Sequence, residues 1–198
     1  MASQQYDIFA VTIPASDEDF YVTTTKPTGA ADLTLAATIP GQNGVGYKVT
    51  ITSDGDEQLK GFVVTGVASN GAVISESIAG PDNATATTTA YFASVSGVSV
   101  NAATAGNVTV GYSATTGVTL PMTRIKGLYY VGATSAGSIV ATRQSDSRVL
   151  LDVKTPAGSG AFADSLYLAA EGIKVAKTPD DMATVVTTNL TATTLFCG

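Results

Sequence analysis

Residues 62–78 read FVVTGVASNGAVISESI, two apolar stretches on either side of Asn70-Gly71. Both stretches are short apolar runs of the kind that form strands. Asn-Gly favours a two-residue type I′ turn, because both central residues of that turn have positive φ. The stretch therefore predicts an antiparallel hairpin.

Short segments of the same kind continue on both sides of this hairpin, each bounded by Gly, Pro, Asn, Asp or Ser. They cover residues 47–52, 91–95, 98–100, 108–112, 128–131, 138–142, 148–154, 184–188 and 193–197. Short strands that recur every 8–12 residues or so are typical of sandwiches and small barrels. The predicted fold class is all-β, with one or two small antiparallel β-sandwich or barrel domains.

Three segments follow from the spacing of these strands. Residues 1–30 are predicted to be an extended N-terminal arm, because a run of threonines and two prolines oppose helix. Residues 31–116 form the first β domain and residues 122–198 a small C-terminal β domain, with a polar linker over 113–121. The two β segments could also form one continuous sandwich.

The composition indicates a globular protein with few charges. Hydrophobic residues make up 44% of the chain and charged residues 13%, against about 25% charged in a typical soluble domain. A neutral polar surface suits a protein packed against copies of itself or a lattice, although an ordinary secreted sandwich is an alternative. The net charge of −6 and the scattered basic residues argue against nucleic-acid binding. The longest apolar runs are too short to span a membrane.

The chain lacks the residues of common catalytic sites. It has no histidine, which removes the commonest general base and the usual metal ligand. Cys197 is the single cysteine, and we expect it to be a buried thiol rather than a nucleophile. Asp54-Gly55-Asp56-Glu57 could suggest calcium, but the full ligand spacing of a calcium loop is missing, which favours a solvated turn. We expect no enzymatic activity, no metal and no cofactor.

Two stretches resemble virion proteins of tailed bacteriophages. Residues 63–112, which contain Asn70-Gly71, Gly80-Pro81-Asp82-Asn83 and Ala105-Gly106-Asn107, resemble an immunoglobulin-like module of phage head and tail proteins. Residues 149–198, with Glu171-Gly172-Ile173 and the final Phe196-Cys197-Gly198, are similar to a small C-terminal domain of phage structural proteins. The resemblance implies an immunoglobulin-like first domain and a place in the virion. It transfers no site residues.

The predicted arm contains the candidate docking residues. They are an acidic run followed by apolar anchors: Asp17, Glu18, Asp19, Phe20, Tyr21 and Val22. An extended arm can add a strand to a neighbour's sheet, where backbone hydrogen bonds give affinity and alternate side chains give register. A solvated, mobile terminus is the alternative.

The expected function is that of a capsid decoration or cement protein, which clamps neighbouring capsid subunits without chemistry. Its partners would be copies of itself, as a homo-oligomer, and other virion proteins, first the major capsid protein. A lone cysteine fits assembly in the reducing host cytoplasm. The alternatives are a head–tail connector, ring or fibre-anchoring subunit, and a carbohydrate- or host-surface-binding β module. Icosahedral copy number would indicate decoration, a small ring would indicate a tail part, and glycan binding would indicate the β module.

Overall fold

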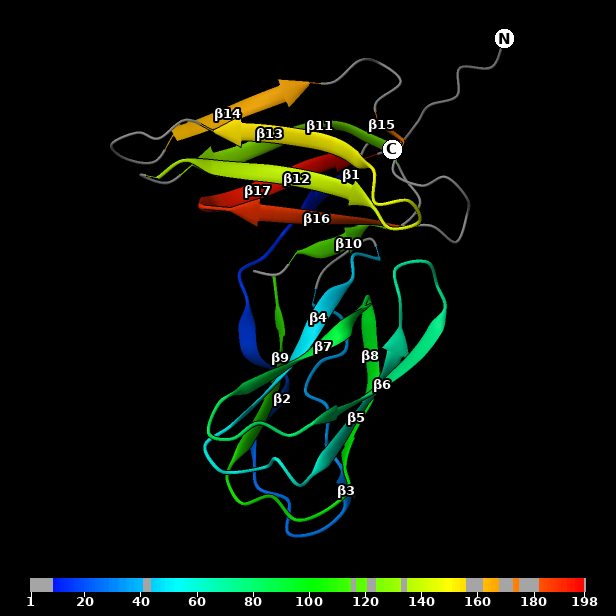
Figure 1. Cartoon of the computed structure of the whole chain (residues 1–198), viewed down its shortest axis with the longest axis vertical. Helices are drawn as coiled ribbons and strands as arrows, with labels where there is room; N and C mark the ends of the chain where they lie inside the picture. The colour runs from blue at the N-terminus through cyan, green and yellow to red at the C-terminus, as the bar shows by residue number, and fades with distance from the viewer. Residues whose placement is uncertain are drawn as a thin grey trace. The chain divides into compact units, whose positions relative to one another are not determined.

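The computed structural model describes residues 9–40, 44–114, 117–120, 124–132, 135–155, 162–167, 173–174 and 182–197. The regular structure of these residues consists of β-strands (Figure 1), so the predicted all-β fold class is confirmed. The described part of the chain has no helix of the length and hydrophobicity that a membrane span requires. The chain divides into two compact units. Unit 1 comprises residues 1–14 and 120–198, and unit 2 comprises residues 15–119.

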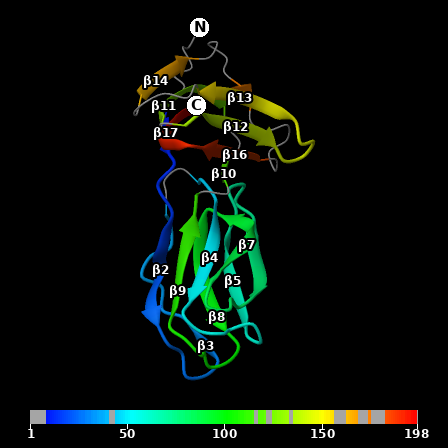
Figure 2. The same ribbon diagram turned by 60° about the vertical axis from the view of Figure 1, so that its left-hand side comes forward.

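Unit 2 is a sandwich of two four-stranded antiparallel sheets (Figures 1 and 2). Its strands are β2 (Asp17–Thr25), β3 (Ala31–Asp32), β4 (Tyr47–Ser53), β5 (Gly61–Val67), β6 (Val73–Ala79), β7 (Thr85–Phe92), β8 (Ser94–Val100) and β9 (Val108–Ser113). The strand order is β2-β9-β4-β7 in one sheet and β3-β8-β5-β6 in the other.

The strand pairs of unit 2 are nested. Strand β2 pairs with β9, β3 with β8, β4 with β7 and β5 with β6. This is one long antiparallel hairpin rolled into two layers, the arrangement called a jelly roll. An immunoglobulin domain keeps its last two strands side by side, whereas here β9 lies between β2 and β4, and β8 lies in the other sheet. The antiparallel sandwich is confirmed, and the immunoglobulin strand order is corrected. Alternation determines which face of a strand is buried but not which strand pairs with it.

The core of unit 2 lies between its sheets. In β5 the residues Phe62, Val64 and Gly66 are buried and the residues between them are partly exposed. Val49 and Ile51 of β4 are fully buried in the opposite sheet. Burying a side chain of this size stabilises the fold by roughly 1.5–3 kcal/mol.

The hairpin that opens the sequence argument is present, but its turn differs from the prediction. The Ala68 amide donates to the Ala72 carbonyl at 2.8 Å, and the Gly71 amide donates to the Ala68 carbonyl at 2.9 Å. Gly71 has a φ of 84°, whereas Asn70 is not among the described residues with positive φ. The connection is therefore a three-residue loop that ends in a left-handed glycine, not a type I′ turn.

Unit 1 also has two antiparallel sheets, of orders β1-β17-β11-β14, with β15 on β11, and β10-β16-β12-β13. Its strands are β1 (Phe9–Thr12), β10 (Val118–Leu120), β11 (Arg124–Gly132), β12 (Gly137–Arg143), β13 (Val149–Thr155), β14 (Phe162–Tyr167), β15 (Ile173–Lys174), β16 (Ala183–Thr188) and β17 (Leu190–Cys197); β10 crosses the boundary between the units. Ile125, Leu128 and Leu195 of the first sheet and Ile139 of the second are fully buried.

The predicted arm is corrected by the strand pairing. Residues 9–12 form β1, which pairs with β17 in unit 1, and residues 17–25 form β2, which pairs with β9 in unit 2. Residues 1–8 lie outside the described residues. Unit 2 is thus inserted in the chain between β1 and the rest of unit 1. Each part of the expected arm therefore belongs to a sheet of its own unit.

Candidate functional site

The predicted docking residues lie at an edge of unit 2, on strand β2. Tyr21 is fully buried and Val22 is 2% exposed. The ring of Phe20 packs edge-on against Tyr21 and Tyr112, with both centroids 5.2 Å away. The apolar half of the motif therefore serves the core of unit 2 itself.

The acidic half of the motif remains at the surface. Glu18 and Asp19 are exposed and Asp17 is partly exposed. Docking through these three carboxylates stays a prediction, now separated from the apolar anchors that were expected to accompany them.

Tyr21 of β2 belongs to a cluster of tyrosines with Tyr112 of β9 and Tyr47 of β4. Burial is the main cause that raises the pKa of Tyr21, followed by the neighbouring Tyr112 and Tyr47. Burial also raises the pKa of Tyr47. The hydroxyls of Tyr21 and Tyr47 have no hydrogen-bond partner in the described part of the chain. These phenols stay protonated and act as packing groups, each with a buried polar atom that is costly to leave unpaired.

Four connections of unit 2 form what we call the loop end: residues 26–30, 54–60, 80–84 and 101–107. Each joins two consecutive strands that lie in opposite sheets. Backbone hydrogen bonds tie them together, from the Glu57 amide to the Pro81 carbonyl at 2.8 Å and from the Thr104 amide to the Pro27 carbonyl at 3.0 Å. Loops are usually the mobile part of a sandwich, and here they support each other.

A buried carboxylate, that of Glu57, is the centre of the loop end. The residue has no exposed surface. Its carboxylate accepts hydrogen bonds from the Gly106 amide at 2.8 Å, the Ala105 amide at 3.1 Å and the Ser53 hydroxyl at 3.1 Å. The ammonium of Lys60 lies 2.6 Å from it. Every direction from which a carboxylate can accept is therefore used within unit 2.

The pKa of Glu57 is subject to two opposing influences, burial and hydrogen bonding. Burial alone would raise it, but the hydrogen bonds from Lys60, the Gly106 and Ala105 amides and Ser53 together hold the pKa of Glu57 below its ordinary value. The group is thus ionised at neutral pH in spite of its burial.

A second carboxylate, that of Asp54, ties the same two loops at the surface. It accepts from the side-chain amide of Asn107 at 2.8 Å and from the Asn107 backbone amide at 2.5 Å. These bonds lower the pKa of Asp54. The backbones at Gly55 and Gly106 approach so closely that a Cβ on either would collide with the other, so both positions require glycine.

The calcium interpretation of residues 54–57 is not supported by this geometry. Asp54 binds Asn107, Glu57 binds two amides and a lysine, and Asp56 accepts from the Gln58 amide at 3.0 Å. The described residues contain no group of three metal-ligating side chains. The carboxylates fasten the loops to one another. The segment is therefore a turn, as expected, but its carboxylates have a structural role that was not expected.

The outermost part of the loop end is a tight turn over residues 57–60. The Lys60 amide donates to the Glu57 carbonyl at 2.8 Å, and the Lys60 ammonium donates to the Asp56 carbonyl at 2.8 Å. Leu59 lies within this turn and is 99% exposed. Asp56 lies directly opposite Asp82 in an isolated antiparallel bridge, which places two exposed acidic residues side by side.

The outer face of strands β8, β5 and β6 is a second candidate surface, and the exposed Asp32 of β3 lies at its border, opposite Ser99. We call it the neutral face, and its members are Val63, Thr65, Val67, Val73, Ser75, Ser77, Ser96, Gly97 and Ser99. The register brings them together, for example Val63 opposite both Ser77 and Ser99. They are small and uncharged, and they are partly or fully exposed.

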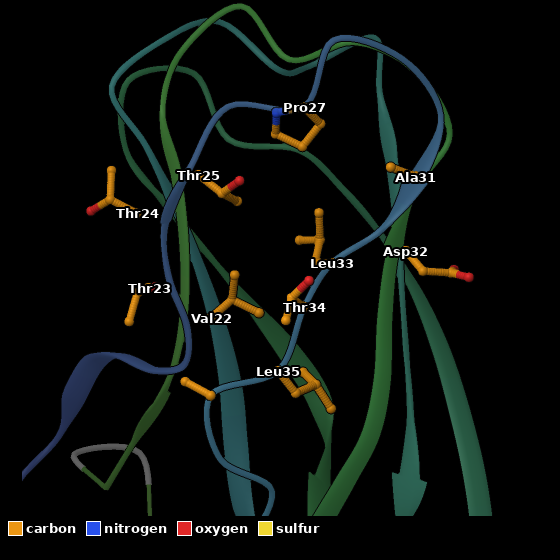
Figure 3. A pocket seen from close by; sticks show the side chains of 11 residues that line it. Val22, Thr23, Thr24, Thr25, Pro27, Ala31, Asp32, Leu33, Thr34 and Leu35 are labelled. Carbon is orange, nitrogen blue, oxygen red and sulfur yellow. The ribbon is translucent and has the colours of Figure 1, made fainter.

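A shallow groove of about 340 Å³ runs between β2 and residues 31–36 (Figure 3). Threonines line its mouth, and Val22 and Leu33, which are almost fully buried, form its floor. The Ala36 amide donates to the Tyr21 carbonyl at 2.7 Å, so this segment closes one side of the sandwich. The groove contains one charged side chain, Asp32, and no constellation for catalysis.

Two further residues have structural roles. Cys197 is fully buried in β17, with Phe9 and Ile125 as its cross-strand partners, as expected for a buried thiol. Glu76 of β6 accepts from the Thr89 and Ala90 amides of β7, each at 2.8 Å. It links the two sheets where β6 and β7 meet. The roles of Glu57 and Glu76 could not be recognised from the sequence, because nothing local distinguishes an amide-binding glutamate from a solvated one.

Comparison with known proteins adds no family to this description. No protein-family model matches the chain, and a search of curated proteins finds no significant match.

Proposed function

We propose that this chain is a non-enzymatic structural protein of a tailed-phage particle, and that it decorates the capsid by packing against neighbouring subunits. The observation that carries the proposal is the neutral face. It spans β6, β5 and β8 and presents valine, serine, threonine and glycine where a solitary soluble domain would carry charges.

The chemistry of this face suits protein contact. Charged side chains are depleted from the centres of protein interfaces, because removing a charge from water is costly unless it is paired. Val63, Val67 and Val73 supply apolar area, and the hydroxyls between them can pair with a partner or with water. The sheet beneath is held by pairing of β5 with β6 along its whole length and with β8 on either side of one irregularity between Thr65 and Gly66, so little ordering is required on contact.

Two further points support the proposal. The carboxylates Glu57, Asp54 and Glu76 hold backbone amides of their own unit, so they act as fasteners rather than as general acids. Jelly rolls occur in viral capsid proteins and in lectins, which is a fold-level analogy. The resemblance of residues 63–112 and 149–198 to virion proteins favours the first of these.

The first test is the copy number of the chain in purified phage particles, by quantitative mass spectrometry against the major capsid protein. Hundreds of copies would support decoration of the head. A dozen or fewer would assign the chain to a connector or tail, and absence from particles would overturn the proposal.

A matched pair of variants tests the neutral face itself. Ser75→Lys places a charge on it, whereas Thr87→Lys places the same charge on β7 of the opposite sheet; both residues are exposed strand positions. We expect Ser75→Lys to reduce incorporation into particles and Thr87→Lys to leave it unchanged. Equal incorporation of the two variants would remove the neutral face from the interface.

A further inference from the structure

We infer that the loop end of unit 2 is a second contact site, at which another protein receives Leu59 in an apolar socket bordered by basic side chains. This inference rests on the proposed structural role and names the chemistry of one partner surface. It is carried by three independent features of the loop end: an exposed leucine, a locked turn and a pair of opposed aspartates.

Leu59 is more fully exposed than the other exposed apolar residues described in unit 2. Single exposed apolar side chains are common, and Val73 of the same unit is 85% exposed on a strand. Leu59 is 99% exposed, and it lies at a turn that projects its side chain away from the sheets. A leucine placed there adds nothing to the core, so its apolar surface is available only to another molecule.

The turn that carries Leu59 is fixed before any partner binds. Glu57 and Lys60, the residues at its two ends, form a 2.6 Å ion pair. The Glu57 carboxylate also binds the amides of Ala105 and Gly106 in a neighbouring loop. A preorganised contact loses less conformational entropy on association than a mobile one. The buried carboxylate therefore gives the loop end a defined shape as well as stability.

The charges around Leu59 indicate which side chains of the partner surround its apolar socket. Asp56 and Asp82 lie directly opposite each other, and like charges in this position are destabilising. Neither carboxylate has an ion-pair partner in the described part of the chain, and the ammonium of Lys60 pairs with Glu57 and donates to the Asp56 carbonyl rather than to its carboxylate. Lysine or arginine from a partner would relieve this repulsion. The same two acids disfavour an anionic membrane or a nucleic acid as the occupant.

The experiment is a competition in the assembled particle. Wild-type chain and a variant with a distinguishable tag are co-expressed during infection, and their ratio in purified particles is compared with their ratio in the lysate. We expect Leu59→Ser to be depleted roughly tenfold, the effect of removing an interface anchor. The matched control is Gln58→Ser, which changes the exposed neighbour in the same turn and should be incorporated like the wild type.

Two readouts separate the possible failures. Thermal unfolding of Leu59→Ser should match the wild type, because the residue is 99% exposed, so depletion cannot be attributed to misfolding. Asp56→Asn combined with Asp82→Asn should raise the stability of the free protein and lower its incorporation. If the wild-type chain is absent from particles, the proposed function fails. If it is present and Leu59→Ser is incorporated equally, the proposed function stands and this inference is overturned.

Discussion

Replacement of Glu57 by glutamine tests whether one buried carboxylate holds the loop end together. The change keeps the size of the side chain but exchanges one acceptor oxygen for an NH₂ donor. In the structure one carboxylate oxygen accepts from Ser53 and Gly106, and the other accepts from Ala105 and pairs with Lys60. Either orientation of the new amide directs its NH₂ group at donors.

The size of the effect follows from what is lost. Hydrogen bonds to a charged group contribute about 1.5–3 kcal/mol each, and two of them become donor–donor contacts. Breaking a buried ion pair by removing one partner costs about 3–5 kcal/mol. The side chain of Lys60 is 18% exposed and its ammonium can turn towards water, which favours the lower end of this range. We expect Glu57→Gln to reduce the free energy of unfolding of unit 2 by about 3 kcal/mol, or about 10–15 °C in Tm for a domain of this size.

The assay is calorimetric or circular-dichroism unfolding of the full chain at pH 7, with Glu18→Gln as the control. Glu18 is exposed on β2, so its replacement removes the same charge without removing a buried contact, and it should change stability by less than about 0.5 kcal/mol. If Glu57→Gln were as stable as this control, the carboxylate would not be fastening the loops. The structural basis for a rigid loop end would then be lost.

Three further predictions concern Glu57 and two other positions of unit 2. The folded-state pKa of Glu57 lies below its ordinary value, so its contribution should be present above about pH 4.3 and be lost as the pH falls through the folded-state pKa; urea unfolding from pH 7 to pH 3 should show a smaller loss in Glu57→Gln. Tyr47→Phe removes a buried hydroxyl without a partner and should be neutral or stabilising by up to about 3 kcal/mol in thermal unfolding; clear destabilisation would reveal a hidden hydrogen bond. Gly111→Ala would drive a Cβ into the backbone of Asp17 and should destabilise by about 1–3 kcal/mol, whereas Gly29→Ala meets no atom within 4 Å and should not.

Many of the strands could be predicted because their signal is local, although residues 91–95, expected to be one strand, contain the break between β7 and β8. The alternation in residues 47–52 corresponds to β4, Tyr47–Ser53, and the strand expected at residues 73–78 corresponds to β6, Val73–Ala79. Each strand covers one side of a core, and side-chain alternation records which side that is. The all-β class followed from several such segments without any knowledge of their pairing.

The strand order could not be predicted in this way. The jelly roll depends on pairs such as Val22 with Val110 in β2 and β9, which lie far apart in the chain. Alternation is the same whether β9 pairs with β2 or with β8, so a sandwich of either order fits the sequence. The insertion of unit 2 between β1 and the rest of unit 1 was missed for the same reason. The pairing of Phe9 with Cys197 has no local signature.

The candidate site was only partly accessible from sequence. The acidic and apolar residues 17–22 were identified as a docking motif because they adjoin each other, but strand geometry turns Tyr21 inwards and leaves Glu18 outside. Glu57 was treated as one acid of a solvated turn. Two of its hydrogen bonds come from the backbone amides of Ala105 and Gly106 in a distant loop. Because backbone amides do not depend on the residue type, the sequence does not reveal which of them will bind a carboxylate.

Five acidic residues of unit 2 fall into two groups: the carboxylates of the first bind amides of a different loop or strand, whereas in the second Asp56 binds the amide of Gln58, two residues further on. Glu57, Asp54 and Glu76 bind amides of their own unit, which explains how a chain with few charges keeps long connections ordered. Asp56 and Asp82 face each other at the surface, and their repulsion opposes folding of the free chain. Fastening the loops accounts for the first group alone. The second group, next to an exposed leucine on a fixed turn, is accounted for by a basic partner surface.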